Sequence, residues 1–505
     1  MAAVDGELAA GWLGSPGTGR MEPVEEGTIL LLVGAVLTAS IVVALGASRT
    51  GVPSLVAFLA LGMVLGSDGL GGIEFDDAEL ARKVGVVCLV AILYEGGLST
   101  SWRRLREVAV PAALLSTVGV VVTALLTGAV AYSIFDLTWL ESVLLGAVVA
   151  STDAAAVFAT LRFTHIPRRL ARTLEAETGG NDPMAIALTL GLIDWIERPG
   201  YVFGDLTLLL IRQLGLGLVV GAALGAVATW AFARIPASIG AFAPVASVAT
   251  AALAYGAADV LGGSGFLAVY LVGLAVGSTP SRYRQQLVSF HEGLAFLAQV
   301  AMFVVLGLLV FPHELPAVAL SGIVLAAALM FVIRPVAVWT STAFSAFTAR
   351  ERALLGWAGL RGAVPIVLGT IVLSSGIGSG KTIFNAVFFV VVVSALAQGT
   401  TLERVAELLG LASPKAPGEA TAKTDREALD LVDFDVTSDH AIAGSRVREL
   451  GLPRHTVVAA VVRDSETVEP TAETRVEAGD RLVVMVPVVL RADLEDVFSR
   501  WRRRV

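Results

Sequence analysis

Residues 141–161 read ESVLLGAVVASTDAAAVFATL, an apolar stretch interrupted at its centre by Ser151, Thr152 and Asp153. A helix needs about 20 apolar residues to cross a bilayer, so this stretch predicts a transmembrane helix. A carboxylate at the middle of a membrane costs at least ~2.5 kcal/mol, and such a residue is a functional candidate by default. Asp153 is therefore a candidate functional residue; the alternative is a structural carboxylate that pairs with a neighbouring helix.

The composition of the whole chain places most of it in lipid. Of its 505 residues, 55% are hydrophobic and only 16% are charged, whereas a soluble domain has about 25% charged residues. The 52 glycines suit the close helix packing of membrane proteins. The formal net charge of −8 comes with no basic cluster, which argues against a nucleic-acid partner. A single cysteine, Cys88, excludes an intrachain disulfide.

Apolar runs of about this length recur along most of the chain and predict an all-α polytopic membrane domain of about thirteen transmembrane helices. The expected segments are 28–46, 52–66, 81–98, 108–134, 139–161, 174–196, 202–232, 238–260, 264–278, 288–311, 316–345, 353–374 and 383–403.

Positive charge gathers in alternate loops between these segments. Because cytoplasmic loops collect Lys and Arg, the Arg-rich set is expected inside, the acidic or neutral set outside, and the odd count puts the N-terminus outside and the C-terminus in the cytoplasm. The membrane is then the plasma (inner) membrane. The Arg-rich set comprises Arg49, Arg103, Arg104, Arg106, Arg162, Arg168, Arg169, Arg172, Arg234, Arg282, Arg284, Arg350 and Arg352.

Four regions follow from the change of composition along the chain. Residues 1–27 are expected to be a disordered extension, in which Met21 is an alternative start, and 28–403 the membrane domain. Residues 404–426 are expected to be a linker and 427–505 a small α/β cytosolic domain. Its alternation predicts strands at 428–436, 456–463 and 480–487 and helices at 441–450 and 491–501.

The sixth segment carries a second polar group, in LEAETGGNDPMAIALTL at 174–190. Thr178 and Asp182 are four residues apart and share one helix face, and Glu177 and Asn181 share the adjacent face. Pro183 removes a backbone hydrogen bond, so the preceding turn is expected to deform and to offer a carbonyl as an ion ligand. Hard cations bind such oxygen-only sites.

The twelfth segment reads GWAGLRGAVPIVLG at 356–369, and the eleventh contains FVIRP at 331–335. These place Arg361 and Arg334 in apolar surroundings, where each needs an acidic or carbonyl partner. Glycines and Pro365 around Arg361 predict that this segment unwinds near its centre. Interrupted helices at corresponding positions of two inverted repeats indicate a transport site, and segments five and twelve fit that description.

Other polar residues are weaker candidates. Glu95 and Glu292 lie near expected cytoplasmic helix ends, where a solvated or structural role is as good an interpretation as transport. Glu175 fits a helix start, where it complements the helix dipole. The five histidines are expected in loops, at helix ends or in the tail, without a metal site.

At TDAAAVF (152–158), ETGGNDP (177–183) and GLRGAVP (359–365), the sequence resembles the NhaP type of monovalent cation/proton antiporter. The resemblance covers nearly all of 28–403. It implies that Asp153 and Asp182 form the ion and proton site, holding the transported metal ion. The remaining implied roles are oxygens from Thr152 and Thr178, an Asn181 associated with electroneutral exchange, a structural pair of Glu177 and Arg361, and a supporting Arg334.

The tail resembles the TrkA-C module of potassium-transport regulators at 436–453, 457–464 and 477–487. Antiporter plus module resembles the cell volume regulation protein A group, which implies K⁺/H⁺ exchange, a homodimer and a small cytosolic ligand of nucleotide type at 427–505. No enzyme activity and no cofactor are expected. Two alternatives stay open: a Na⁺(Li⁺)/H⁺ antiporter, and a cation channel gated by the tail.

Overall fold

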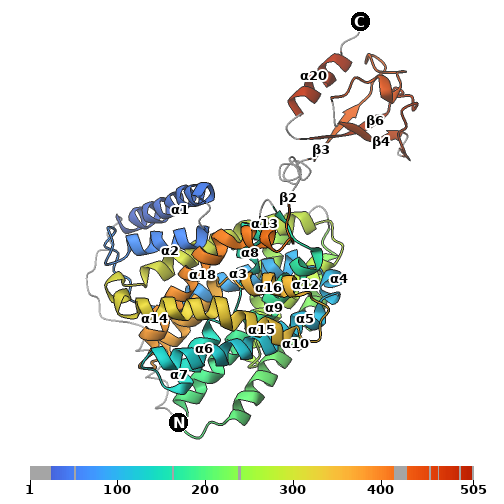
Figure 1. Cartoon of the computed structure of the whole chain (residues 1–505). Coiled ribbons are helices and arrows are strands. Elements are labelled where there is room, and N and C mark those ends of the chain that lie inside the picture. The colour runs from blue at the N-terminus through green and yellow to red at the C-terminus, as the bar shows by residue number, and fades with distance from the viewer. Residues whose placement is uncertain are drawn as a thin grey trace, which may run out of the picture. The chain divides into compact units, whose positions relative to one another are not determined.

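The computed structural model describes residues 24–50, 53–161, 164–236, 240, 242–414, 429–453, 456–463, 466–487 and 491–502. The chain divides into two compact units (Figure 1). The first unit is the helical one, Met1–Leu161 with Ile166–Ala412, and the second is Arg162–His165 with Ser413–Val505.

Every apolar segment expected from the sequence is helical, which confirms the fold class. By length and composition, seven of the described helices can cross a membrane on their own, and several shorter apolar helices accompany them. The uninterrupted helices are α1 (Val24–Thr50), α2 (Ser54–Leu65), α3 (Ala78–Ser99), α9 (Arg168–Glu197), α10 (Phe203–Phe232), α11 (Ala243–Val260), α12 (Gly265–Ser278), α13 (Arg284–Leu308) and α18 (Gly380–Leu408). The fourth segment joins α5 (Ala109–Leu114), η1 (Leu115–Gly119) and α6 (Val120–Ile134), and the eleventh joins α14 (Leu315–Ala328), η4 (Leu329–Ile333) and α15 (Arg334–Ser341).

The helices pack as two bundles. One contains α2, α3 and α10 to α13, and the other contains α5 to α9 and α14 to α18. Glycine lets α3 and α12 touch backbone to backbone, because a Cβ on Gly277 would lie 2.0 Å from the Leu98 carbonyl oxygen, and one on Gly97 would lie 2.3 Å from that of Tyr270. We call the bundle that contains α3 and α12 the α3/α12 bundle.

The fifth and twelfth segments are each interrupted, as the sequence predicts. The fifth consists of α7 (Trp139–Val148) and α8 (Ala154–Thr160), and the twelfth of α16 (Ala349–Trp357) and α17 (Ala363–Ser374). The two interruptions cross, because the backbone N–H of Asp153 donates to the Leu360 carbonyl at 2.8 Å. A Cβ on Gly362 would lie 2.0 Å from Oδ2 of Asp153, so the crossing requires glycine there.

Contacts between helix ends fit the expected topology. On the Arg-rich side, the Trp102 N–H donates to the Ser278 hydroxyl at 2.8 Å, and Arg169 donates to the Ala346 carbonyl at 2.8 Å. On the opposite side, Lys381 Nζ lies 2.5 Å from Glu314 Oε1, His313 pairs with Asp68, and the Ser379 hydroxyl donates to Glu141 at 2.6 Å. Each of these contacts joins two loops that the expected topology places on the same side of the membrane.

The second unit has its own apolar core around Phe434, Val461 and Trp501. Its four-stranded antiparallel sheet has the order β3-β6-β4-β5, and α20 (Arg491–Trp501) contributes to the core (Figure 1). The strands are β3 (Leu429–Asp435), β4 (Val457–Arg463), β5 (Glu466–Val468) and β6 (Arg481–Pro487), and a separate pair joins β1 (Thr164–His165) to β2 (Ser413–Pro414).

One expected helix of the tail is wrong. Residues 441–450 form turns, with a single 3-10 turn at Val447–Glu449. Gly444 has a φ of 91°, a left-handed conformation that a helix cannot contain. Its N–H donates to the carbonyl of Val476 at 2.7 Å, so this segment pairs with a neighbouring loop rather than with itself.

Two expected boundaries differ from the structure. Helix α1 begins at Val24, inside the expected extension 1–27, and residues 1–23 lie outside the described residues. Helix α18 continues to Leu408, beyond the expected end of the membrane domain at residue 403. Of the expected linker, residues 415–426 also lie outside the described range.

Candidate functional site

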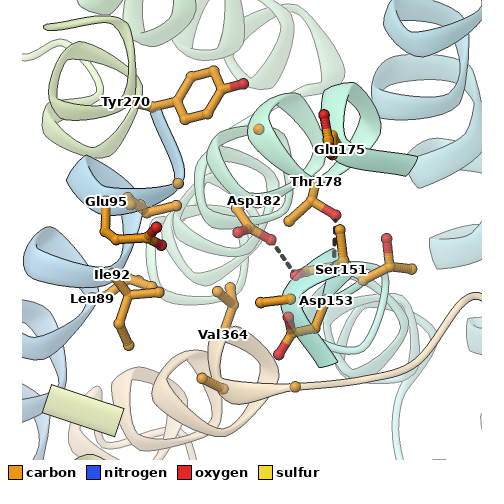
Figure 2. A pocket seen from close by; sticks show the side chains of 18 of the residues that line it. Leu89, Ile92, Glu95, Ser151, Asp153, Glu175, Thr178, Asp182, Tyr270 and Val364 are labelled. Atoms are coloured by element: carbon orange, nitrogen blue, oxygen red, sulfur yellow. Dashed lines mark hydrogen bonds between the residues drawn. The ribbon is translucent and has the colours of Figure 1, made fainter. Parts of the chain in front are cut away.

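A partly open cavity of about 270 Å³ lies where the two crossed interruptions meet α9 and the α3/α12 bundle (Figure 2). Its lining includes Asp153 and Asp182, and it extends to Ser99 and Thr100 at the Arg-rich end of α3. Four carboxylates line the cavity, from Glu95, Asp153, Glu175 and Asp182, and no Lys or Arg is among its described lining residues. The cavity is therefore an acidic pocket that reaches from the middle of the bundle toward the Arg-rich side.

Asp182 lies on α9 at the base of this cavity and is only 4% exposed. Its Oδ1 accepts a hydrogen bond from the Ser151 hydroxyl at 2.5 Å, so the interruption of the fifth segment supplies its partner. Figure 2 shows Asp182 and Ser151 directed toward each other across the cavity wall. A buried carboxylate with one neutral donor remains short of ligands, which a proton or a cation can provide.

Asp153 begins α8 as its N-cap residue, and its Oδ1 accepts from the Ala156 N–H at 3.1 Å. The next backbone N–H, of Ala154, donates to the hydroxyl of Thr178 at 3.1 Å. This bond ties α8 to α9 and brings Thr178 beside the carboxylate. The stretched backbone between α7 and α8 thus positions Asp153 at the cavity.

Thr152 and Asn181 form a hydrogen bond that fixes the interrupted segment to α9. Nδ2 of Asn181 donates to Oγ1 of Thr152 at 2.6 Å, and both side chains are buried. The structure therefore brings together all five residues expected at the ion and proton site. Carboxylate and hydroxyl oxygens dominate this cluster, as a hard cation requires.

The backbone of α9 stays helical through Pro183, from Arg168 to Glu197, so the expected deformation does not interrupt the helix. Room at this turn comes instead from its two glycines. A Cβ on Gly179 would lie 2.2 Å from Cζ of Tyr270, and one on Gly180 would lie 2.7 Å from Oγ of Ser116. The glycines allow neighbouring helices to approach α9 beside the cavity.

The expected ion pair between Glu177 and Arg361 is not the one that forms. Oε1 of Glu177 lies 2.7 Å from Nη1 of Arg334, and both side chains are almost fully buried, at 1% and 3% exposure. Arg361 instead donates to two backbone carbonyls, of Ala150 at 2.8 Å and Ser151 at 2.7 Å. Those carbonyls lie within the interruption of the fifth segment, so Arg361 compensates the negative ends of its backbone dipoles.

Comparison with known proteins places this arrangement in a family. The family model for the transmembrane sodium/hydrogen exchanger matches residues 36–408. The K⁺/H⁺ antiporter NhaP2 of Shewanella baltica is 37% identical over 478 residues, which cover 93% of this chain and 83% of that protein. The chain belongs to the sodium/hydrogen exchanger family.

Further relatives agree with this family membership. The K⁺/H⁺ antiporter NhaP of Alkalimonas amylolytica is 38% identical over 449 residues, covering 86% of this chain and 77% of that protein. The TrkA-C domain model matches residues 431–499, which confirms the expected tail module. The solved structure of the sodium proton antiporter MjNhaP1 from Methanocaldococcus jannaschii shares the exchanger fold, with a TM-score of 0.66 at 24% identity over 76% of this chain and 99% of that one.

Some residues of this exchanger's cavity were missed in the sequence. In the sequence Ser151 is only one part of the polar interruption, yet in the structure its hydroxyl is the hydrogen-bond partner of Asp182. Glu175 lies inside α9, which begins at Arg168, so it lines the cavity rather than capping a helix start. Glu95 lines the same cavity and accepts from Ser99 at 2.6 Å. Tyr270 joins them from α12, and an aromatic residue in an apolar helix gives no local signal of such a position.

His291 also differs from its expected place at a helix end. It lies inside α13 with 1% exposure, and its Nε2 is 2.7 Å from the Ser247 hydroxyl. Its ring packs against Tyr94 with centroids 4.6 Å apart. Among the described residues, no group of three His, Cys, Asp or Glu side chains is placed to hold a resident metal ion.

Proposed function

We propose that this protein exchanges a monovalent cation, with K⁺ favoured, for H⁺ across the plasma membrane. The observation that supports this function best is the pair of carboxylates, Asp153 and Asp182, at the crossing of two interrupted helices in a cavity whose described lining has no Lys or Arg. Without a fixed cationic partner, the carboxylates need a proton or a cation from solution. Competition between the two for the same oxygens couples their transport.

The proposed cycle uses the oxygens that the structure brings together. In the inward-facing state, the cation binds Asp153 and Asp182 with hydroxyl oxygens of Ser151 and Thr178, and displaces the proton. Movement of the bundle that contains the crossed interruptions relative to the α3/α12 bundle carries the occupied site across the membrane. The names of the K⁺/H⁺ relatives at 37% and 38% identity favour K⁺ over Na⁺.

The test is proton movement in proteoliposomes. Purified protein is reconstituted with a pH-sensitive dye inside, a proton gradient is imposed, and K⁺, Na⁺ or Li⁺ is added over a series of pH values. We expect K⁺ to dissipate the gradient at the lowest concentration. A better response to Na⁺ or Li⁺ would favour the alternative antiporter, and cation flux without proton movement would favour a channel.

The remaining assignments belong to the same proposal. The Arg-rich loops support a cytoplasmic C-terminus and an inner-membrane location for cation, pH or volume homeostasis. A homodimer is proposed, with a small cytosolic ligand of nucleotide type at 427–505 as regulator of exchange.

Deletion of residues 415–505 should leave exchange active but insensitive to cytosolic conditions, since all residues of the cavity lie earlier in the chain. An inserted but inert truncation would contradict this modular interpretation.

A further inference from the structure

Tyr270 lies on the wall of the acidic cavity and is not among the expected site residues. Its side chain is 6% exposed, and its hydroxyl oxygen is buried beside the hydroxyl of Thr100, with no well-aligned hydrogen bond to a residue that the structure describes. The hydroxyl of Thr100, on the same wall, donates to the Gly96 carbonyl at 2.7 Å. A buried hydroxyl that forms no hydrogen bond is unfavourable. A ligand inside the cavity that contacts the Tyr270 hydroxyl would supply the missing interaction.

Tyr270 reaches across the boundary between the two bundles. Its helix α12 is fixed to α3 by the backbone contacts of Gly97 and Gly277, whereas Asp182 lies on α9 of the other bundle. The ring packs directly on α9 at Gly179, where a Cβ would lie 2.2 Å from Cζ and 2.4 Å from the hydroxyl oxygen. Figure 2 shows the hydroxyl directed toward the helix that carries Thr178 and Asp182.

The position of the phenol complements the other groups of the cavity. Asp182 already accepts from Ser151, and the Thr178 hydroxyl already accepts from the Ala154 N–H. These oxygens all come from the bundle of the crossed interruptions. The ring of Tyr270 lines the cavity from the α3/α12 bundle, and its hydroxyl oxygen lies against α9 beside Gly179 without a well-aligned hydrogen bond.

We propose that Tyr270 is a specificity-determining residue of the exchanger, whose phenolic oxygen replaces one water of the cation's hydration shell in the cavity. This inference rests on the proposed cation/proton exchange. A neutral oxygen suits a large, weakly hydrated ion such as K⁺ better than Na⁺ or Li⁺, which hold their water more strongly, because ligand field strength contributes to selection among these ions. The phenolic oxygen of Tyr270 can replace this water only in the arrangement of the two bundles seen in this structure, because Tyr270 and Asp182 lie on different bundles.

The test compares Tyr270→Phe with wild type in the proteoliposome assay, measuring apparent KM and maximal rate for K⁺ and for Na⁺. Phenylalanine keeps the ring on Gly179 and removes only the oxygen. Loss of one such contact should raise the KM for K⁺ roughly three- to tenfold, with little change in maximal rate and a smaller change for Na⁺. Tyr94→Phe is the matched control, since Tyr94 is also buried but bonds to Thr250 at 3.3 Å and is not part of the cavity lining.

Each result decides the role of Tyr270. An unchanged KM for K⁺, or a lower maximal rate with an unchanged KM, would overturn it in favour of a ring that serves packing alone. A KM raised equally by Tyr94→Phe would overturn it as well. A wild-type protein that moves no protons with any cation would refute the proposed function itself, whereas active wild type with an unaltered Tyr270→Phe variant would refute only this inference. Thermal unfolding in detergent shows that each variant is folded.

Discussion

The two clusters of buried charge in the membrane domain share helix α9 and differ in their partners. In the first, Glu177 forms an ion pair with Arg334 at 2.7 Å, and Arg361 donates to backbone carbonyls nearby. In the second, Asp153 and Asp182 meet hydroxyl and N–H donors only. A buried charge without an opposite charge is strongly unfavourable. The difference teaches that the two clusters suit different roles: the first is a closed ion pair, and the second is the one proposed to take a proton or a cation from solution.

The largest expected effect comes from removing a carboxylate of the second cluster. Asp182→Asn keeps the shape of the side chain and its contact with Ser151, but it removes the carboxylate that is proposed to exchange a proton for a cation. We expect exchange to fall to the level of empty liposomes while the protein remains folded. The measurement is dye dequenching with K⁺ after reconstitution, with thermal unfolding in detergent as the test of folding.

The matched control for this variant is Asp194→Asn on the same helix. Asp194 pairs with Arg198 at 2.9 Å, and the arginine is 66% exposed, so the loss of this pair should change little. Exchange at the wild-type rate in Asp182→Asn, or loss of exchange in Asp194→Asn, would contradict the assignment of the second cluster.

The next effect separates the two possible partners of Glu177. Neutralising either member of a buried pair leaves an uncompensated charge, which should lower the free energy of unfolding by about 3–5 kcal/mol. A double-mutant cycle of Glu177→Gln with Arg334→Gln should show strong coupling, whereas the cycle with Arg361→Gln should show less. Denaturant unfolding in detergent measures both cycles. Stronger coupling to Arg361 would restore the pairing expected from the sequence.

This choice of partner illustrates what the sequence could and could not predict. Hydrophobic runs predicted the helical segments, Gly/Pro positions predicted the interruption of the twelfth segment, and the polar centre indicated that of the fifth, because these features depend on local composition. That Asp153 and Asp182 form one site was implied by the resemblance to NhaP-type antiporters. Two arginines, however, were equally available to Glu177, and only the packing of α15 against its neighbours decides between them.

The same limit explains the other differences. Tyr270 enters the cavity because α12 touches α3 through glycines, a relation between distant segments. In the tail, residues 441–450 have the pattern of a helix, but Gly444 adopts a left-handed conformation and pairs with Val476. Tertiary hydrogen bonds outweighed local propensity there. The residues of the cavity that were missed are those whose role depends on another helix.

A smaller effect is expected where a buried carboxylate of the tail has a fixed partner. Asp480 is 1% exposed and receives two hydrogen bonds from Arg463, each 2.8 Å. These bonds lower the pKa of Asp480 below its ordinary value of 3.8. A lowered pKa means that this stabilisation is complete above about pH 4 and is lost as the pH falls through the pKa of the folded state.

Arg463→Gln should therefore destabilise the tail by about 1–2 kcal/mol at neutral pH and move its acid unfolding to higher pH. Hydrogen exchange of strands β4 and β6 in the full-length protein measures this. Exchange of cations should continue, in contrast to Asp182→Asn. Acid unfolding at the same pH as in wild type would show that Arg463 does not hold Asp480 ionised.

The smallest expected effect is that of the membrane potential, which should not change the rate of exchange. With Asp153 and Asp182 as the acids that titrate and Glu177 held by Arg334, a cycle that swaps one H⁺ for one cation moves the same charge in both directions. A potential acts with about 2.3 kcal/mol per charge per 100 mV on net charge movement only. Proteoliposomes polarised with a lipophilic anion, which the protein does not carry, should therefore exchange at equal rates under either polarity.

Asn181 provides the matched variant, because its amide bonds to Thr152 at 2.6 Å directly beside Asp182. Asn181→Asp adds an acid at this position, so that more than one proton can move per cation and one polarity should accelerate exchange. A polarity effect already present in wild type would show that a further carboxylate, such as Glu95 or Glu175 on the cavity wall, takes part in the cycle.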